Sequence, residues 1–153
     1  MGEKTVITAA LSIFILSIVK WLGILIAGIV ILSETNDAVS ICYELWIACL
    51  VYMILDTLNT FISCADQSNN NDGDGNTNPC FNLFKIIFSL GQIGILIWIT
   101  WIHGNMSNEC RAIYHSDYSR LWDYSVAILS VGWIFAALGI IVLGIGIAAV
   151  VSN

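Results

Sequence analysis

Four long apolar blocks constrain this chain more than any other feature of its sequence. In chain order they are Val6–Leu32, Ile41–Ser63, Phe81–His103 and Leu121–Val151. A helix needs about 20 mostly apolar residues to cross the roughly 30 Å hydrocarbon core of a bilayer, and each block is longer than that. Because lipid offers peptide groups nothing to bond, each block is predicted to form a helix. Membrane strands are disfavoured, since they need only about 10 residues of alternating polarity.

The composition supports the same class of protein. Of 153 residues, 58% are hydrophobic and 10% are charged, and the mean hydropathy is +0.86. A soluble domain has about 25% charged residues, so this chain cannot solvate a globular surface of its size. That excludes a soluble enzyme and a disordered chain. The net charge of −6 excludes a nucleic-acid partner.

The blocks leave no room for a second domain. We therefore expect one all-α, polytopic membrane domain over residues 1–153, an antiparallel bundle of four transmembrane helices. Both termini and the loop 64–80 would then share one side, the termini side, and the loops 33–40 and 104–120 would lie on the far side. The first block is too long for a signal peptide and no basic region precedes it, so no cleaved presequence is expected.

Basic residues do not decide the orientation. Lys4 and Lys85 lie near the termini side, and Arg111 and Arg120 lie near the far side, so the usual excess of cytosolic Lys and Arg is missing. A glycosylation sequon begins at Asn105 and favours a far side that is outside, with cytosolic termini. We expect an integral protein of the plasma membrane or the secretory pathway, with the mitochondrial inner membrane as the alternative.

Five cysteines offer two disulfides whose partners share a side. Cys42 could pair with Cys110 on the far side, or Cys64 with Cys80 on the termini side. A disulfide needs an oxidising compartment, so at most one of the two pairs is expected, and the sequence does not decide which. Cys49 lies within a block and is predicted to pack as a small hydrophobic residue.

The loop 64–80 is rich in Asn, Asp and Gly. Asn70, Asp72 and Asp74 match positions 1, 3 and 5 of a calcium-binding loop, but Phe81 stands where a bidentate Glu is required. A plain connection between two helices is the preferred interpretation, with a calcium site as the weak alternative. No other metal and no cofactor are expected.

Two charged residues lie deep inside the predicted helices. Lys20 is near the middle of its block, and Asp56 lies about one turn from the middle of the next. A charge at the bilayer centre costs roughly 3 kcal/mol, so we predict that the two form an ion pair. Asn59 shares a helix face with Asp56, and Gln92 lies at mid-depth, so either could donate to the pair. A pair that fixes helix register is the simpler interpretation, and a proton or ion path is the alternative.

Aromatic and small residues suggest where other molecules touch the bundle. Trp and Tyr anchor at lipid headgroups and also dominate protein interfaces. An aromatic belt on the far side is therefore preferred over a cap that binds a partner. Eight of the eleven Trp and Tyr residues lie on or near that side: Tyr43, Trp46, Trp98, Trp101, Tyr114, Tyr118, Trp122 and Tyr124. The glycine-rich fourth block allows close helix packing, within the chain or against another subunit.

Several features along the chain carry a family resemblance. They are Gly23–Gly28 closing the first block, Cys42 opening the second, Trp98–Gly104 closing the third, then Cys110 and the Leu121–Tyr124 start of the fourth. In this order the chain resembles small four-span eukaryotic membrane proteins of the transmembrane protein 272-like family. It departs from them in lacking a proline where the second block begins. The resemblance implies four spans with cytosolic termini and implies no particular activity.

Catalytic patterns are missing from the sequence. His103 and His115 flank Cys110 without the paired spacing of zinc ligands, and there is no phosphate-binding loop or nucleophile elbow. We expect no enzyme activity, but a structural or accessory subunit of a larger membrane complex. Its partners would be the lipid bilayer and other membrane subunits or a second copy. The alternative is a small ion or proton channel or transporter that uses Lys20, Asp56 and Gln92.

Overall fold

The computed structural model describes residues 3–36, 38, 42–70 and 79–151, with side chains for 12, 15–36, 38, 42–65 and 82–141. Its helices are α1 (Glu3–Glu34), α2 (Tyr43–Asn70), α3 (Pro79–Asn105), α4 (Asn108–Ser116) and α5 (Ser119–Val151). The described part of the chain contains no strand. Helices α1, α2, α3 and α5 are long and apolar enough to cross a membrane. The predicted all-α four-helix membrane architecture is therefore confirmed.

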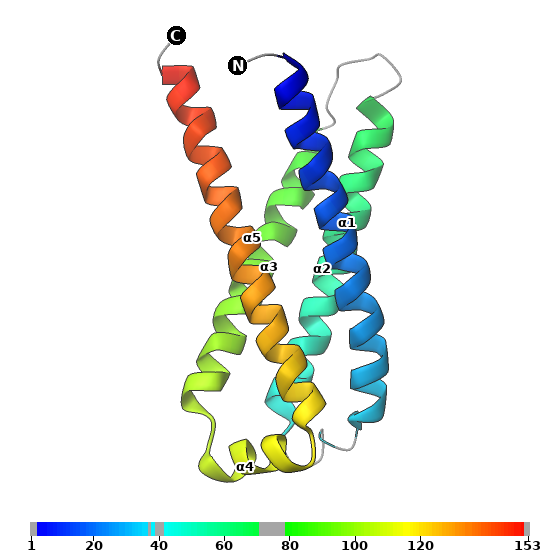
Figure 1. Cartoon of the computed structure of the whole chain (residues 1–153), viewed down its shortest axis with the longest axis vertical. Coiled ribbons are helices and arrows are strands. Elements are labelled where there is room, and N and C mark those ends of the chain that lie inside the picture. Colours follow the sequence, from blue (N-terminus) through cyan, green and yellow to red (C-terminus); the bar gives the residue numbers. More distant parts are fainter. Residues whose placement is uncertain (1–2, 37, 39–41, 71–78, 152–153) are drawn as a thin grey trace.

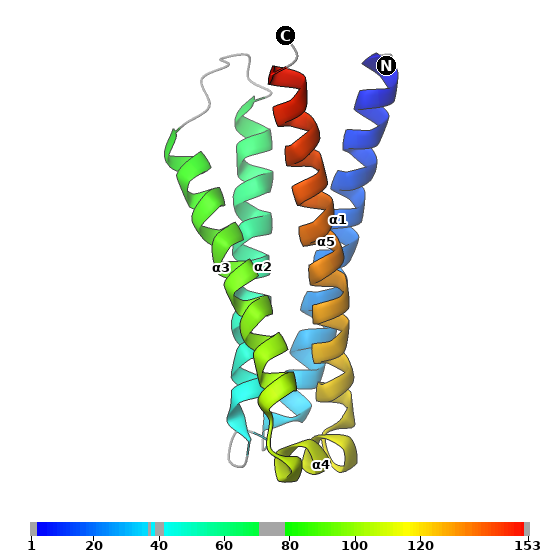
Figure 2. The same cartoon turned by 90° about the vertical axis from the view of Figure 1, so that its left-hand side faces the viewer.

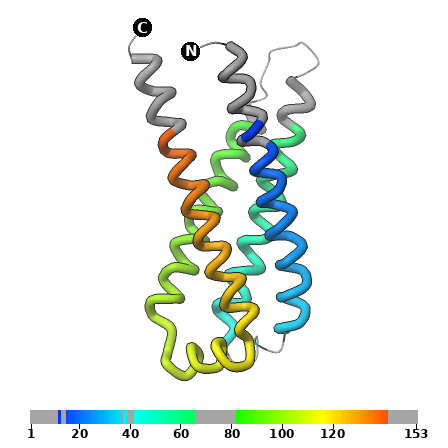
Figure 3. Tube along the Cα trace, in the orientation of Figure 1, coloured from blue at the N-terminus to red at the C-terminus, as the bar shows by residue number. Residues whose placement is uncertain are grey.

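The four long helices run antiparallel, and Figure 3 follows the Cα trace through them. The start of α1 and the end of α5 lie at one end of the bundle, and α4 lies at the other (Figures 1 and 2). Helix α2 packs on both α1 and α3, and α5 packs on the other side of both. Since α1 and α3 share no packing in the described residues, they are diagonal to each other.

The helix ends differ from the ends of the apolar blocks. Helix α2 continues past the expected end at Ser63 to Asn70, because leaving the hydrocarbon does not by itself end a helix. The connection 104–120 contains a short helix, α4, that the sequence did not predict. Ser107 caps this helix, and its Oγ accepts from the backbone N–H of Cys110 at 3.2 Å.

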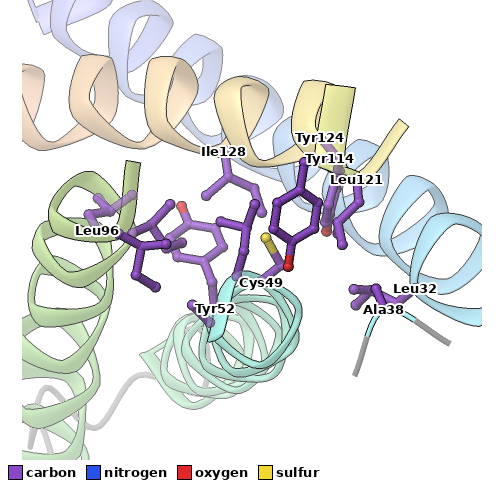
Figure 4. Close-up of a cluster of buried hydrophobic side chains, with 13 residues drawn as sticks. Leu32, Ala38, Cys49, Tyr52, Leu96, Tyr114, Leu121, Tyr124 and Ile128 are labelled. Atoms are coloured by element: carbon purple, nitrogen blue, oxygen red, sulfur yellow. The ribbon is translucent and has the colours of Figure 1, made fainter. Parts of the chain in front are cut away.

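The apolar core occupies only one half of the bundle. We call the described residues of 24–52 and 96–128 the disulfide half, and residues 12–23, 53–65, 82–95 and 129–141 the termini half. All 13 buried hydrophobic residues among the described side chains lie in the disulfide half. Figure 4 shows Cys49 and Tyr52 of α2 among side chains from α3 and α5. In the termini half, only Asp56 and Gly132 are buried among the residues with described side chains.

Covalent and polar links close the disulfide half. A disulfide joins Cys42, just before α2, to Cys110 in α4. The hydroxyl of Tyr114 donates to the carbonyl oxygen of Cys42, and Arg111 Nη2 donates to the carbonyl oxygen of His103 at 2.9 Å. Burial raises the pKa of the Tyr114 phenol, so this group stays protonated and remains a donor at neutral pH.

Candidate functional site: an ion pair inside the membrane

Three helices contribute polar side chains at one level of the bundle. Lys20 comes from α1, Asp56 from α2 and Gln92 from α3, and each stands in a helix that is otherwise mostly apolar. Helix α2 lies between the other two, so side chains from either side can reach Asp56. This is the border of the termini half, just beyond the apolar core.

The lysine and the aspartate form the predicted ion pair. Lys20 Nζ lies 2.5 Å from Asp56 Oδ1, and the two side chains are 15% and 2% exposed. Gln92 Nε2 donates to the same Oδ1 at 2.6 Å, and Asn59 Nδ2 donates to Gln92 Oε1 at 3.0 Å. A continuous chain of hydrogen bonds therefore joins all four residues that the sequence singled out. Hydrogen bonds to charged groups are the strong ones.

Three further residues surround the pair. Lys20 Nζ lies 5.2 Å from the centre of the Phe135 ring, so α5 also contributes through a cation–π contact. Trp21 Nε1 donates to Thr57 Oγ1 at 3.2 Å, which gives α1 and α2 a second link beside the first. The sequence alone did not single out these three residues. Trp21 and Thr57 each follow a member of the pair by one position, and this parallel spacing was a signal for a second contact between α1 and α2. Phe135 gives no such signal, because it is one aromatic residue in an apolar helix.

The hydrogen bonding of the site is one-sided. Both described donors to the Asp56 carboxylate reach Oδ1, and none of the described residues donates to the buried Oδ2. The buried Oδ1 of Asn59 also has no donor. The hydroxyl of Thr60 donates to the backbone carbonyl of Asp56 at 2.8 Å and so does not serve either oxygen. The site therefore balances its charges but can accept further donors.

The structure also decides between the predicted disulfides. Cys42 and Cys110 are joined, whereas Cys64 is exposed and carries a free thiol. The alternative Cys64–Cys80 bond is therefore not formed. Cys49 is a free thiol at 0% exposure in the apolar core, as expected for a packing residue.

The remaining candidate residues lie apart from the ion pair. Asn105 is exposed at the end of α3, and its Nδ2 donates to the carbonyl oxygen of Trp101 at 3.0 Å. For the calcium interpretation, Asp72 and Asp74 lie outside the described residues, and Asn70 ends α2 without a described side chain. No group of three His, Cys, Asp or Glu residues that could hold a metal ion occurs among the described residues.

The aromatic residues near the far side serve different purposes. The ring of Trp122 contacts two histidine rings, with centroid distances of 4.3 Å to His103 and 4.6 Å to His115. Tyr43 and Trp101 instead are 54% and 56% exposed. Part of the predicted belt is thus internal packing of the disulfide half, and part faces the surroundings.

Fold and composition define the class of this protein: a small integral membrane protein with four helices able to span a bilayer. Comparison of the chain with protein-family models, curated proteins and solved structures finds no match. What the protein does must therefore be inferred from its own geometry.

Proposed function

We propose that the protein is a non-catalytic, structural or accessory subunit that packs against other membrane-spanning chains. The observation that supports this best is a set of glycines with no neighbour. A Cβ added at Gly23, Gly94 or Gly139 would meet nothing within 4 Å. Small residues in membrane helices allow a second backbone to approach closely. Since the described residues place nothing against these three positions, we infer that their small size serves another chain.

Two other glycines show what packing within the chain looks like. A Cβ at Gly132 would lie 2.5 Å from Leu96 Cδ2, and one at Gly28 would lie 2.6 Å from Met53 Sδ. Each of these glycines makes room for a side chain of a neighbouring helix. Among the described residues, no side chain of a neighbouring helix fills the space beside Gly23, Gly94 or Gly139.

Helix α5 has an exposed apolar row that a partner could contact. Ile134, Leu138 and Ile141 follow one another at helical spacing and are 59%, 51% and 56% exposed. Lipid tails satisfy such a surface as well as a protein does. Gly139 lies about 100° around the helix from Leu138, on another face, so the open glycine, and not this row, favours a second helix over lipid alone.

The experiment is gentle solubilisation followed by identification of the chains that co-purify. We expect Gly139→Leu to release a partner, because the added side chain fills the space that a second backbone would occupy. Ala137→Leu is the matched control, since Ala137 is exposed on another face of the same helix. A wild-type chain that runs as a lone monomer in mild detergent would contradict the proposal.

The second candidate is a small proton or ion channel or transporter. Its support is the buried Oδ2 of Asp56, which has no protein donor. A conducting state would also have to open the disulfide half, where Leu45, Cys49 and Ile99 are each 0% exposed. Flux into liposomes that disappears with Asp56→Asn, but not with Glu44→Gln at an exposed carboxylate, would favour this candidate. Wild-type liposomes without flux would reject it.

A further inference from the structure

We propose that Asp56 Oδ2 and Asn59 Oδ1 together bind one water molecule, and that water reaches them only from the termini end of the bundle. This site goes beyond the subunit role and does not depend on it. Both oxygens are buried acceptors that receive no hydrogen bond from the described part of the chain, and they belong to residues three positions apart on α2, which share a helix face.

Water fits the chemistry of these two oxygens. A buried polar atom left unpaired costs about 1–3 kcal/mol, and a single water has two hydrogens, one for each oxygen. Buried waters typically make about three hydrogen bonds. The third can come from Lys20, whose ammonium has three N–H groups and gives one to Asp56 Oδ1. The polar groups therefore match a water in number and in kind.

A bound metal ion or an added proton fits less well. Among the described residues, the titratable groups that interact with Asp56 are Lys20 from α1, Tyr52 from its own helix and Tyr124 from α5, while α3 contributes the neutral Gln92. A second cation would lie beside the Lys20 ammonium and repel it, and a proton on Asp56 would leave Lys20 as an unpaired charge in the membrane. A neutral donor avoids both costs.

The route for water differs between the two directions along α2. Toward the termini end, Asn59, Thr60 and Ser63 are polar and only partly buried. Toward the far side, the helix presents Tyr52, Cys49 and Leu45, which are 2%, 0% and 0% exposed. Ile99 and Ile128 close the same level from α3 and α5 at 0% and 1% exposure. The polar path thus ends at Asp56.

The direction of access can be tested with cysteines in sealed vesicles and a charged, membrane-impermeant thiosulfonate reagent. In a background with Cys64→Ser and Cys80→Ser, we expect Ser63→Cys to react fast and Asn59→Cys to react more slowly, both from the termini side only. The native, exposed Cys64 in a parallel sample identifies that side. Native Cys49 is expected to stay unmodified from either side.

A lipid-facing position at the same depth provides the control. Leu58 is 41% exposed and adjacent to Asn59 in the sequence, so Leu58→Cys should stay unreactive because lipid, not water, covers it. The proposal fails if the cysteine at position 59 is inert from both sides or reacts from the far side. It also fails if Cys49 or the cysteine at position 58 reacts as fast as the cysteine at position 59.

Occupancy of the site can be measured by brief X-ray radiolysis, which oxidises side chains next to bound water. The ring of Phe135 lies near Lys20, and we expect its oxidation to fall several-fold in Asn59→Leu, which removes one acceptor and fills its space. Oxidation of Phe61, which is 60% exposed and makes an edge-to-face contact with Trp21, should not change. Unchanged oxidation of Phe135 in a variant that elutes like the wild type would overturn the water site.

Discussion

The two halves of the bundle are held together by different interactions. The disulfide half contains every buried hydrophobic residue of the described chain, and a disulfide ties α4 to the start of α2. The termini half has no buried hydrophobic side chain among those described, and its helices are joined by Lys20, Asp56 and Gln92. Helices α1 and α5 are close near α4 and lie farther apart at the other end (Figures 1 and 2).

This contrast follows from the solvent. Lipid tails are as apolar as leucine, so apolar helix faces gain little by leaving lipid for one another. Close packing in the disulfide half must come from complementary shape and from the covalent link. Polar groups in the termini half have no alternative partners in lipid, so their bonds can set the register of three helices without a tight core around them.

Breaking the ion pair should have the largest effect on stability. We expect Lys20→Met or Asp56→Leu alone to cost about 3–5 kcal/mol, because each leaves one buried charge without its partner. The double variant should recover most of that loss, since two apolar side chains replace a neutralised pair. The free energy of unfolding in detergent, measured for all four chains of the double-mutant cycle, gives the coupling between the two residues.

Two outcomes of that double-mutant cycle would contradict the claim that the ion pair stabilises the termini half. In one, each single substitution leaves the unfolding free energy unchanged, so the pair does not contribute. In the other, the double variant loses the sum of the two single losses, so each residue acts through some other contact.

Removing the disulfide should have the next largest effect and should act on the other half. We expect Cys42→Ser with Cys110→Ser to cost about 2–4 kcal/mol, because the open chain gains conformational freedom in the unfolded state. Protease cleavage at α4 should become faster. Cys64→Ser is the control, since that thiol is free and exposed.

Removing the disulfide in the double variant of the ion pair tests whether the two halves are stabilised independently. Independent halves predict losses that add within about 0.5 kcal/mol. A clear excess or deficit would show that the packing of one half depends on the other.

The sequence could predict the features on which lipid places local rules, and could not predict those that depend on how the helices and loops are arranged. The four helices and the Lys20–Asp56 pair were predictable because lipid imposes strong local rules on length and on charge. Helix α4 has no long apolar run, so those rules did not reveal it. The contact with Phe135 depends on how α5 is rotated about its axis, and a helix that is apolar all round does not specify that angle. Which disulfide forms depends on where the loops end, which the spacing of cysteines left open.

The smallest expected effect comes from two glycines on one helix. Gly28 lies in the disulfide half, where a Cβ would be 2.6 Å from Met53 Sδ and 3.2 Å from Tyr124 Cζ. The hydroxyl of Tyr124 donates to the carbonyl oxygen of Ile24 at 2.9 Å, so its ring cannot move away freely. We therefore expect Gly28→Ala to cost about 1–3 kcal/mol through overpacking.

Gly23 lies on α1 at the edge of the termini half and has nothing within 4 Å of its Cβ position. In the isolated chain, Gly23→Ala should be neutral or should stabilise by up to about 1 kcal/mol, because alanine favours the helix more than glycine does. Thermal unfolding of the two variants in detergent compares the halves directly. Equal losses at both positions would mean that the termini half is as tightly packed as the disulfide half. A loss at Gly23 that appears only when a partner is present would instead mark the surface at which another chain binds.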